Sequence, residues 1–131
     1  MINVKLLIVD DEELIRNVIK EYAKLENYEV DEAEDGDEAI EKALSKDYDV
    51  IVMDIMMPKL NGLDATRKIR SLKRQDAKTV PIIAMSANAF VEDIMNSKIA
   101  GMNMHLAKPL DETKLINALK QCKKDEDFKA Q

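Results

Sequence analysis

The 131-residue chain has the length of one domain and enough residues to bury a hydrophobic core. Its 20 basic and 26 acidic residues give a net charge of −6, which argues against a general nucleic-acid-binding protein because such proteins present a basic face. The single cysteine, Cys122, excludes an intramolecular disulfide framework, and no segment has the roughly 18 consecutive apolar residues of a membrane span. We therefore expect a cytoplasmic protein without a transmembrane segment.

Strands and helices are expected to alternate from the start of the chain. The run "VKLLIV" at 4–9 is short, apolar and rich in branched residues, which favours a buried strand. Apolar residues at helical spacing then predict a helix over residues 14–23. A polar, weakly alternating segment at 28–34 is typical of an edge strand, and a second helix is expected over 39–44.

The middle of the chain repeats this order. "DVIVM" at 49–53 is a continuous apolar run and predicts a strand covered on both faces. A loop with a proline and an Asn-Gly pair follows, and a third helix with a basic outer face is expected over 63–72. The run "VPIIAM" at 80–85 predicts the fourth strand.

The last part of the chain adds one strand between two helices. A fourth helix is expected to end at Gly101, because glycine suits a C-terminal cap. A short fifth strand is predicted over 104–107, and a fifth helix after Asp111 as its N-terminal cap. We assign residues 1–124 to one domain and expect the polar tail, 125–131, to be frayed.

Five strand–helix units in strict alternation predict an α/β fold, doubly wound, with helices on both faces of a parallel sheet. The polar second strand suits an edge of this sheet, and the apolar first and third strands suit its centre. In open parallel sheets, ligands bind outside the carboxyl ends of the strands. Candidate functional residues are therefore sought at these ends.

Charged and hydroxyl side chains follow the strands at that edge. The first strand ends in Asp10 and Asp11, the third in Asp54 and the fourth in Ser86, and Lys108 follows the fifth. Three carboxylates so close together repel one another unless cations neutralise them, and Lys108 supplies one positive charge. A hard divalent ion with oxygen ligands supplies the rest, so the cluster predicts a Mg²⁺ site.

The same cluster predicts phosphoryl chemistry, because Mg²⁺ sites keep waters and recruit phosphate oxygens. Asp11 and Asp54 are expected to be direct ligands, Asp10 an outer-shell ligand, and a backbone carbonyl just past Asp54 a further ligand. Asp54 would be the nucleophile that forms an aspartyl phosphate. The groups expected to hold phosphoryl oxygens are the side chains of Lys108 and Ser86 and the backbone N–H of Ala87.

Four motifs carry a resemblance to a known family. They are "LLIVDDEE" (6–13), "DVIVMDIMMPKLNGLDATRKIR" (49–70), "VPIIAMSANAF" (80–90) and "AGMNMHLAKPL" (100–110). In this order and spacing they resemble the receiver domain of the two-component response-regulator family, over essentially the whole chain. The last two also resemble receivers of hybrid histidine kinases and phosphorelays. The resemblance implies a flavodoxin-like sheet with the strand order 2-1-3-4-5, flanked by five helices.

This resemblance also implies roles for the residues. Asp54 matches the phosphoacceptor, Met56 would give its backbone carbonyl to Mg²⁺, and the Lys108–Pro109 peptide bond is expected to be cis. Mn²⁺ is expected to be able to substitute for Mg²⁺ at this site. The donor would be a phosphohistidine of a histidine kinase or a histidine phosphotransfer protein. The chain would then lose the phosphoryl group slowly by its own catalysis, and it would act as an enzyme on nothing else.

Three positions depart from the family or tune its chemistry. His105 stands where many members have Tyr or Phe, and it is either a switch residue or an edge-strand histidine without a switching role. The side chains of Met56 and Asn88 are expected to flank the path of the attacking water, and the apolar Met56 predicts a long-lived phosphoryl group. A downstream partner is expected on the face of the fourth helix, fifth strand and fifth helix, through Phe90, Ile94, Met95, Lys98, His105 and Lys114.

Other functions fit the sequence less well. An aspartate-nucleophile phosphatase would need a carboxylic acid two residues past Asp54, where the chain has Met56. A flavin-binding module would need a phosphate loop after the first strand, where the chain has "DDEE". A docking module that works without phosphorylation normally lacks an acidic residue or the lysine. The sequence is consistent both with a stand-alone regulator and with a receiver excised from a larger protein.

Overall fold

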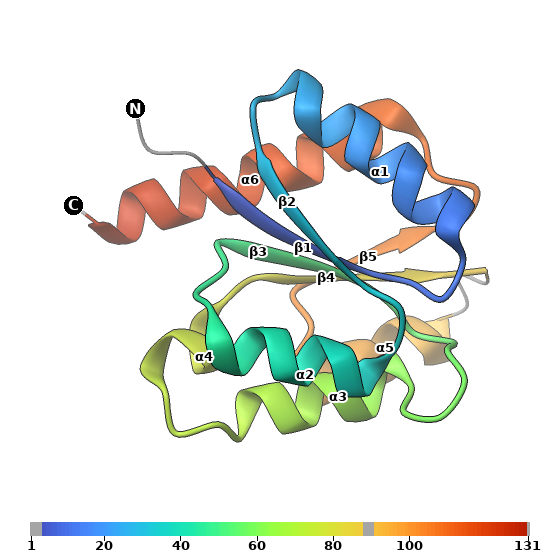
Figure 1. Cartoon of the computed structure of the whole chain (residues 1–131), viewed down its shortest axis with the longest axis vertical. Helices are drawn as coiled ribbons and strands as arrows, with labels where there is room; N and C mark the ends of the chain where they lie inside the picture. The colour runs from blue at the N-terminus through green and yellow to red at the C-terminus, as the bar shows by residue number, and fades with distance from the viewer. Residues whose placement is uncertain (1–3, 88–90, 131) are drawn as a thin grey trace.

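The protein is built around one parallel sheet. The computed structural model describes residues 4–87 and 91–130. The five strands of the sheet lie in the order β2-β1-β3-β4-β5 (Figure 1). They are β1 (Lys5–Val9), β2 (Glu29–Ala33), β3 (Val50–Asp54), β4 (Ile82–Ser86) and β5 (Met104–Ala107). The predicted order is confirmed, with the polar second strand at an edge.

Helices cover both faces of the sheet. They are α1 (Glu13–Leu25), α2 (Gly36–Ser45), α3 (Gly62–Arg70), α4 (Gln75–Thr79), α5 (Val91–Ala100) and α6 (Glu112–Ala130). Figure 1 shows α1 and α6 on one face and the other four helices on the opposite face. No helix in residues 4–87 and 91–130 is long and apolar enough to cross a membrane.

Alternate residues of the central strands supply two separate cores. On β1, Leu6 and Ile8 belong to the core beneath α1 and α6, whereas Leu7 and Val9 belong to the core on the other face. Successive strand residues point to opposite faces, so a sheet covered on both sides needs a continuous apolar run. This explains why β1 and β3 read as unbroken apolar segments.

The predicted ends of two helices are confirmed. Gly101 has a φ of 109°, and the N–H groups of Gly101 and Met102 donate to the carbonyls of Lys98 and Ser97 at 3.0 and 2.9 Å. This is the hydrogen-bond pattern of a glycine C-terminal cap. At the start of α6, Oδ1 of Asp111 accepts from the backbone N–H of Lys114 at 3.1 Å.

The described part of the chain has six helices, one more than the sequence predicts. The additional helix, α4, has five residues and lies between the predicted third helix and fourth strand, in a segment for which the sequence predicts no element. It buries Ala77, whose carbonyl accepts from the Arg70 guanidinium at 3.1 Å. A five-residue helix is too short to give a periodic apolar pattern, which explains why the sequence does not reveal it.

The last helix is also longer than expected. Residues 125–130 are helical in the structure, where the sequence analysis expects a frayed tail. Lys, Glu and Ala favour helix, and the segment has no Gly or Pro to end it. The boundary of the domain at residue 124 remains a prediction.

Candidate functional site

The structure brings the predicted residues together at one end of the sheet. Asp10 follows β1, Asp54 ends β3 and Ser86 ends β4. The backbone N–H of Lys108, just past β5, donates to the Ser86 carbonyl at 2.8 Å. The parallel register places Asp54 beside Met85 and Ser86 beside Ala107. The carboxyl ends of β1, β3, β4 and β5 therefore form one site.

Lys108 is the central cation of this site. Its Nζ lies 3.0 Å from Oδ2 of Asp10 and 3.2 Å from Oδ2 of Asp54. A third carboxylate, on Glu12, lies 3.9 Å away. Burial opposes the charge on Lys108, but the hydrogen bonds and charges of Asp10 and Asp54 outweigh it and raise the pKa of the ammonium group. Lys108 thus stays positive and joins two strands.

Asp54 is a buried carboxylate whose charged form is disfavoured by its surroundings. Its side chain is 4% exposed. Burial and the nearby charge of Asp10 raise the pKa of Asp54 to about 6, against the lowering effects of Lys108 and of the Met56 N–H. A group that would titrate so far above its ordinary range gains from any further cation placed beside it. Perturbed carboxyl groups of this kind are typical of functional sites.

Three consecutive carboxylates lie next to the ion pair of Lys108 and Asp54. Oxygens of Asp10, Asp11 and Glu12 lie within 4.8 Å of one another. Oδ1 of Asp10 accepts from the backbone N–H of Glu12 at 2.9 Å, which fixes its orientation. Such a set of oxygen donors fits a hard divalent cation. Asp54 is linked to this set by Lys108, whose ammonium group contacts both Asp10 and Asp54. Glu12 is a candidate ligand that the sequence analysis does not name, although it belongs to the "DDEE" motif.

The loop after β3 holds Asp54 from the other side. The backbone N–H of Met56 donates to Oδ1 of Asp54 at 3.2 Å. Gly62 closes this loop, and its N–H donates to the Ile55 carbonyl at 2.9 Å. A Cβ at Gly62 would lie 2.2 Å from the carbonyl oxygen of Asp54, so only glycine fits there. The family resemblance implies a role for the Met56 carbonyl, and the structure adds one for the Met56 N–H.

Ser86 and His105 contact each other across two neighbouring strands. The Ser86 hydroxyl lies 2.7 Å from Nε2 of His105. The serine is buried and the histidine half-buried, so His105 is not simply an exposed edge residue. The predicted cis peptide bond between Lys108 and Pro109 is confirmed. Ala87 is exposed next to Ser86. Asn88 and Phe90 lie outside the described residues.

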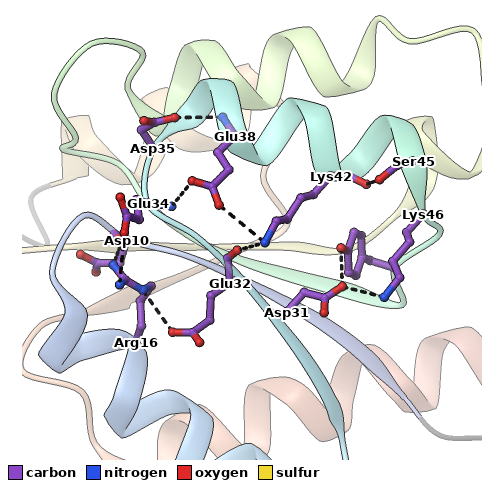
Figure 2. Close-up of polar contacts among 11 residues, drawn as sticks. Asp10, Arg16, Asp31, Glu32, Glu34, Asp35, Glu38, Lys42, Ser45 and Lys46 are labelled. Carbon is purple, nitrogen blue, oxygen red and sulfur yellow. Dashed lines mark hydrogen bonds and ion pairs between the residues drawn. The ribbon is translucent and has the colours of Figure 1, made fainter.

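An arginine missed by the sequence analysis supports the acidic end of the site. Arg16 lies on α1 and is only 8% exposed. Its guanidinium donates to the backbone carbonyl of Asp10 at 2.8 Å and to Glu32 of β2 at 3.2 Å. Figure 2 shows Arg16 between Asp10 and Glu32. The sequence does contain a signal for this role of Arg16. The arginine lies beside Ile15 and Ile19, on the apolar face of a predicted helix.

Comparison with known proteins gives consistent matches. The model of the response regulator receiver domain family matches residues 6–120. The transcriptional regulatory protein ResD of Bacillus subtilis is 38% identical over 116 residues, which is 88% of this chain. This chain spans 46% of the length of ResD.

Two solved structures extend the likeness to the fold. The chemotaxis response regulator CheY4 of Vibrio cholerae has a TM-score of 0.85 and 30% identity, covering 92% of this chain and 99% of that one. The receiver domain of the sensor histidine kinase PA1611 of Pseudomonas aeruginosa has a TM-score of 0.83 and 37% identity, covering 92% and 97%. A magnesium ion is coordinated in the active site cleft of the PA1611 receiver.

Proposed function

Because the chain belongs to the response regulator receiver domain family, we propose that it accepts a phosphoryl group on Asp54 from a phosphohistidine of a partner protein. One observation carries the proposal: Asp54 is a buried carboxylate at a strand end, paired with Lys108 and beside Asp10. A structural ion pair needs only one carboxylate for each lysine. The excess negative charge here suits a site that binds cations and transfers phosphoryl groups.

The transfer needs a nucleophile and groups that hold the phosphoryl oxygens. An oxygen of Asp54 forms the new P–O bond while the P–N bond to the donor imidazole breaks, and the imidazole leaves with the electron pair. Lys108 is 3.2 Å from Asp54 and pairs with a phosphoryl oxygen after transfer. The Ser86 hydroxyl and the Ala87 N–H bind the other oxygens.

A divalent cation fits the carboxylates at this site. Asp11 and Asp54 would hold Mg²⁺ directly, with the Met56 carbonyl as a further ligand and Asp10 as an outer-shell partner. The cluster of Asp10, Asp11 and Glu12 oxygens supports this, as does the magnesium ion of the PA1611 receiver. Mg²⁺ would supply positive charge against the negative charge that develops on the phosphoryl oxygens, and Mn²⁺ would replace it.

The cycle ends when water removes the phosphoryl group from Asp54. The chain acts as its own catalyst in both steps and has no other substrate. Met56 lies two residues past Asp54 and is 73% exposed, and it would slow the attack of water because a thioether chain cannot orient it. Asn88 would flank the same path.

Signalling then passes to a partner at a surface away from the acidic cluster. We place it on α5, β5 and α6, where Met95 is 56% exposed and Lys98 and Lys114 are exposed. Phosphoryl binding by Ser86 would be communicated to this face through β4 and β5. The partners are a histidine kinase or histidine phosphotransfer protein as donor and a protein as output target, in the cytoplasm and without direct binding to nucleic acid.

Intact-protein mass spectrometry tests the proposal. The protein is incubated with acetyl phosphate and Mg²⁺, and Asp54→Asn and Asp49→Asn are treated in parallel. The parent and Asp49→Asn are expected to gain one phosphoryl group, while Asp54→Asn gains none. Unmodified parent protein would contradict the proposal and favour a docking module that works without phosphorylation.

A further inference from the structure

Arg16 is a buried cation that reaches back from α1 to the end of β1. Helical side chains point toward the N-terminus of their helix, so an arginine in the first turn of α1 reaches the loop after β1. There Nη1 donates to the backbone carbonyl of Asp10 at 2.8 Å, and Nε donates to Glu32 of β2 at 3.2 Å (Figure 2). Because a buried charge is costly unless its hydrogen bonds are made, these contacts hold the guanidinium in place.

Neutralisation of Glu32 does not by itself account for this arginine. Lys20, one turn further along α1, already pairs with Glu32 at 3.0 Å. The contact that distinguishes Arg16 from Lys20 is the hydrogen bond to the Asp10 carbonyl. A planar guanidinium can hold this carbonyl and the Glu32 carboxylate at the same time, which a single ammonium nitrogen does less rigidly.

The Asp10 carbonyl belongs to the peptide group that leads into Asp11. A peptide group is planar, so the direction of this carbonyl also fixes the N–H and the Cα of Asp11. The other side of Asp10 is held too, because its N–H donates to the Ala33 carbonyl of β2 at 3.2 Å. The backbone from which the Asp11 side chain leaves is therefore fixed by β2 and by Arg16.

The carboxylate of Asp11 has no support of its own. It is exposed, and it forms no hydrogen bond or ion pair with any residue that the structure describes. The carboxylate of Asp10, in contrast, is held by the Glu12 N–H and by Lys108. Metal-binding carboxylates are usually oriented by hydrogen bonds from surrounding groups. For Asp11, the backbone has to supply this orientation.

We propose that Arg16 is a positioning residue for the divalent cation: its guanidinium holds the Asp10 carbonyl and thereby directs the carboxylate of Asp11 toward the acidic cluster. The inference rests on the proposed function, in which Asp11 is a direct ligand of Mg²⁺. Arg16 itself is not a ligand. It acts through the peptide group between Asp10 and Asp11.

Two effects of Arg16 on a bound cation have opposite signs. Its positive charge lies close to the acidic cluster and repels Mg²⁺, so loss of this charge alone would tighten binding. Loss of the hydrogen bond to the Asp10 carbonyl would weaken binding, because Asp11 would no longer be held toward the cation. The direction of the change in Mg²⁺ affinity therefore separates positioning from charge.

Titration calorimetry of the unphosphorylated protein with Mg²⁺ measures this direction. Arg16→Met should raise the Kd for Mg²⁺ about tenfold. Lys20→Met is the matched control: it removes the same charge and a contact to the same Glu32, but it leaves the Asp10 carbonyl bonded. Its Kd should change by less than about twofold, because a partly exposed charge is screened. An Arg16→Met protein that binds Mg²⁺ as tightly as the parent, or more tightly, would overturn the proposal.

Arg16→Lys keeps the positive charge and serves if Arg16→Met does not fold. Because one nitrogen replaces the guanidinium fork, the Kd for Mg²⁺ should rise about threefold. Thermal unfolding checks that each variant is folded. Parent-like affinity in a folded Arg16→Lys protein would show that the guanidinium geometry is not needed, and it would also overturn the proposal.

A second measurement needs neither metal nor a phosphoryl group. Nitrogen-15 relaxation reports how rigidly the Asp11 N–H is held, and rigid backbone has an order parameter of about 0.85. We expect a rigid Asp11 N–H in the parent and in Lys20→Met, and a lower order parameter in Arg16→Met. An Asp11 N–H that is equally rigid without the arginine would overturn the positioning role.

A double-mutant cycle with Asp11→Asn shows whether Arg16 acts through Asp11. In the Asp11→Asn protein, Arg16→Met should change the Kd for Mg²⁺ by no more than about twofold. An equal loss of affinity with and without the Asp11 carboxylate would assign Arg16 a structural role only. A parent protein that binds Mg²⁺ but takes no phosphoryl group would overturn the proposed function and leave this inference standing. A parent that binds no Mg²⁺ would overturn both.

Discussion

The Nζ atom of Lys108 lies 3.2 Å from Oδ2 of Asp54. Asp54 ends β3 and Lys108 follows β5, so the lysine side chain reaches across the end of β4, which lies between these strands. The same Nζ lies 3.0 Å from Asp10, whose side chain is fully buried. One ammonium group therefore contacts two carboxylates at the ends of different strands and offsets only one of their two negative charges. This arrangement links the stability of the fold to the chemistry of the site.

Replacement of Lys108 tests this link. Lys108→Met is expected to lower the free energy of unfolding by about 3 kcal/mol at pH 7.5, because it leaves buried carboxylates without their cation. Phosphorylation by acetyl phosphate should slow by more than about tenfold, since no cationic side chain then pairs with the phosphoryl oxygens. Urea unfolding and intact-protein mass spectrometry measure the two effects. Lys120→Met, at an exposed position of α6, is the control and should change neither.

The raised pKa of Asp54 predicts a dependence of stability on pH in the metal-free protein. The folded protein holds a proton on Asp54 up to a pH of about 6, above the ordinary value of 3.8, so the charged form opposes folding above pH 6. Asp54→Asn should therefore raise the free energy of unfolding at pH 7.5 by as much as about 3 kcal/mol. The gain should shrink as the pH falls from 6 to 4.

Urea unfolding between pH 4 and 8, with a chelator present, measures this dependence. Asp37→Asn, at an exposed position of α2, serves as the comparison and should show no such trend. If Asp54→Asn were equally destabilising at every pH, burial would not penalise the charge of Asp54 as described.

Metal binding is expected to depend on Asp11 more than on Glu12. Both carboxylates belong to the same acidic cluster, but Glu12 lies 3.9 Å from the Lys108 ammonium. Asp11 forms no ion pair within residues 4–87 and 91–130, so it is available to a cation. Asp11→Asn should weaken Mg²⁺ binding by about tenfold or more, measured by calorimetry, and Glu12→Gln by less than about threefold. The reverse ranking would make Glu12 the principal ligand.

The side chain of Met56 is expected to lengthen the life of the phosphoryl group. It is 73% exposed, so substitution there leaves the core intact. Met56→Asn and Met56→Glu should speed loss of the phosphoryl group about threefold to tenfold, because a polar group can orient the attacking water. The decay of phosphorylated protein is followed by mass spectrometry, with Leu25→Asn as an exposed control far from the site. Decay at the parent's rate in both Met56 variants would refute this role.

Gly62 is expected to tolerate no side chain. A Cβ there overlaps the carbonyl oxygen of Asp54 at 2.2 Å, and backbone on both sides must move to relieve it. Gly62→Ala should lower the free energy of unfolding by about 2–4 kcal/mol and reduce phosphorylation of Asp54. Lys68→Ala, at an exposed position of the same helix, should do neither. A Gly62→Ala protein with the parent's stability would show that this loop is more adaptable than described.

The sequence predicts the sheet and most of the site because each functional side chain directly follows an apolar run. Asp10, Asp54 and Ser86 interrupt or end such runs, and Lys108 precedes a proline after the last one. Parallel strands bring their carboxyl ends to one edge, so a pattern local in sequence becomes a site in space. No long-range contact has to be guessed for this step.

The contacts that the sequence does not predict are those between distant segments. Arg16 reaches Glu32 and the carbonyl of Asp10 only once β2 lies beside β1. The bond between His105 and Ser86 requires the register of β4 and β5, and the short helix α4 depends on packing of Ala77 rather than on periodicity. Hydropathy identifies where side chains gather but not which atoms pair.

The most direct test of the central claim is to locate the phosphoryl group by borohydride trapping. Reduction converts an aspartyl phosphate into homoserine, and peptide mapping by mass spectrometry then identifies the modified residue. After treatment with acetyl phosphate and Mg²⁺, we predict conversion at Asp54 and at no other carboxylate, and none when Mg²⁺ is withheld. Conversion at Asp10 or Asp11, or no conversion anywhere, would contradict the assignment of Asp54 as the phosphoacceptor.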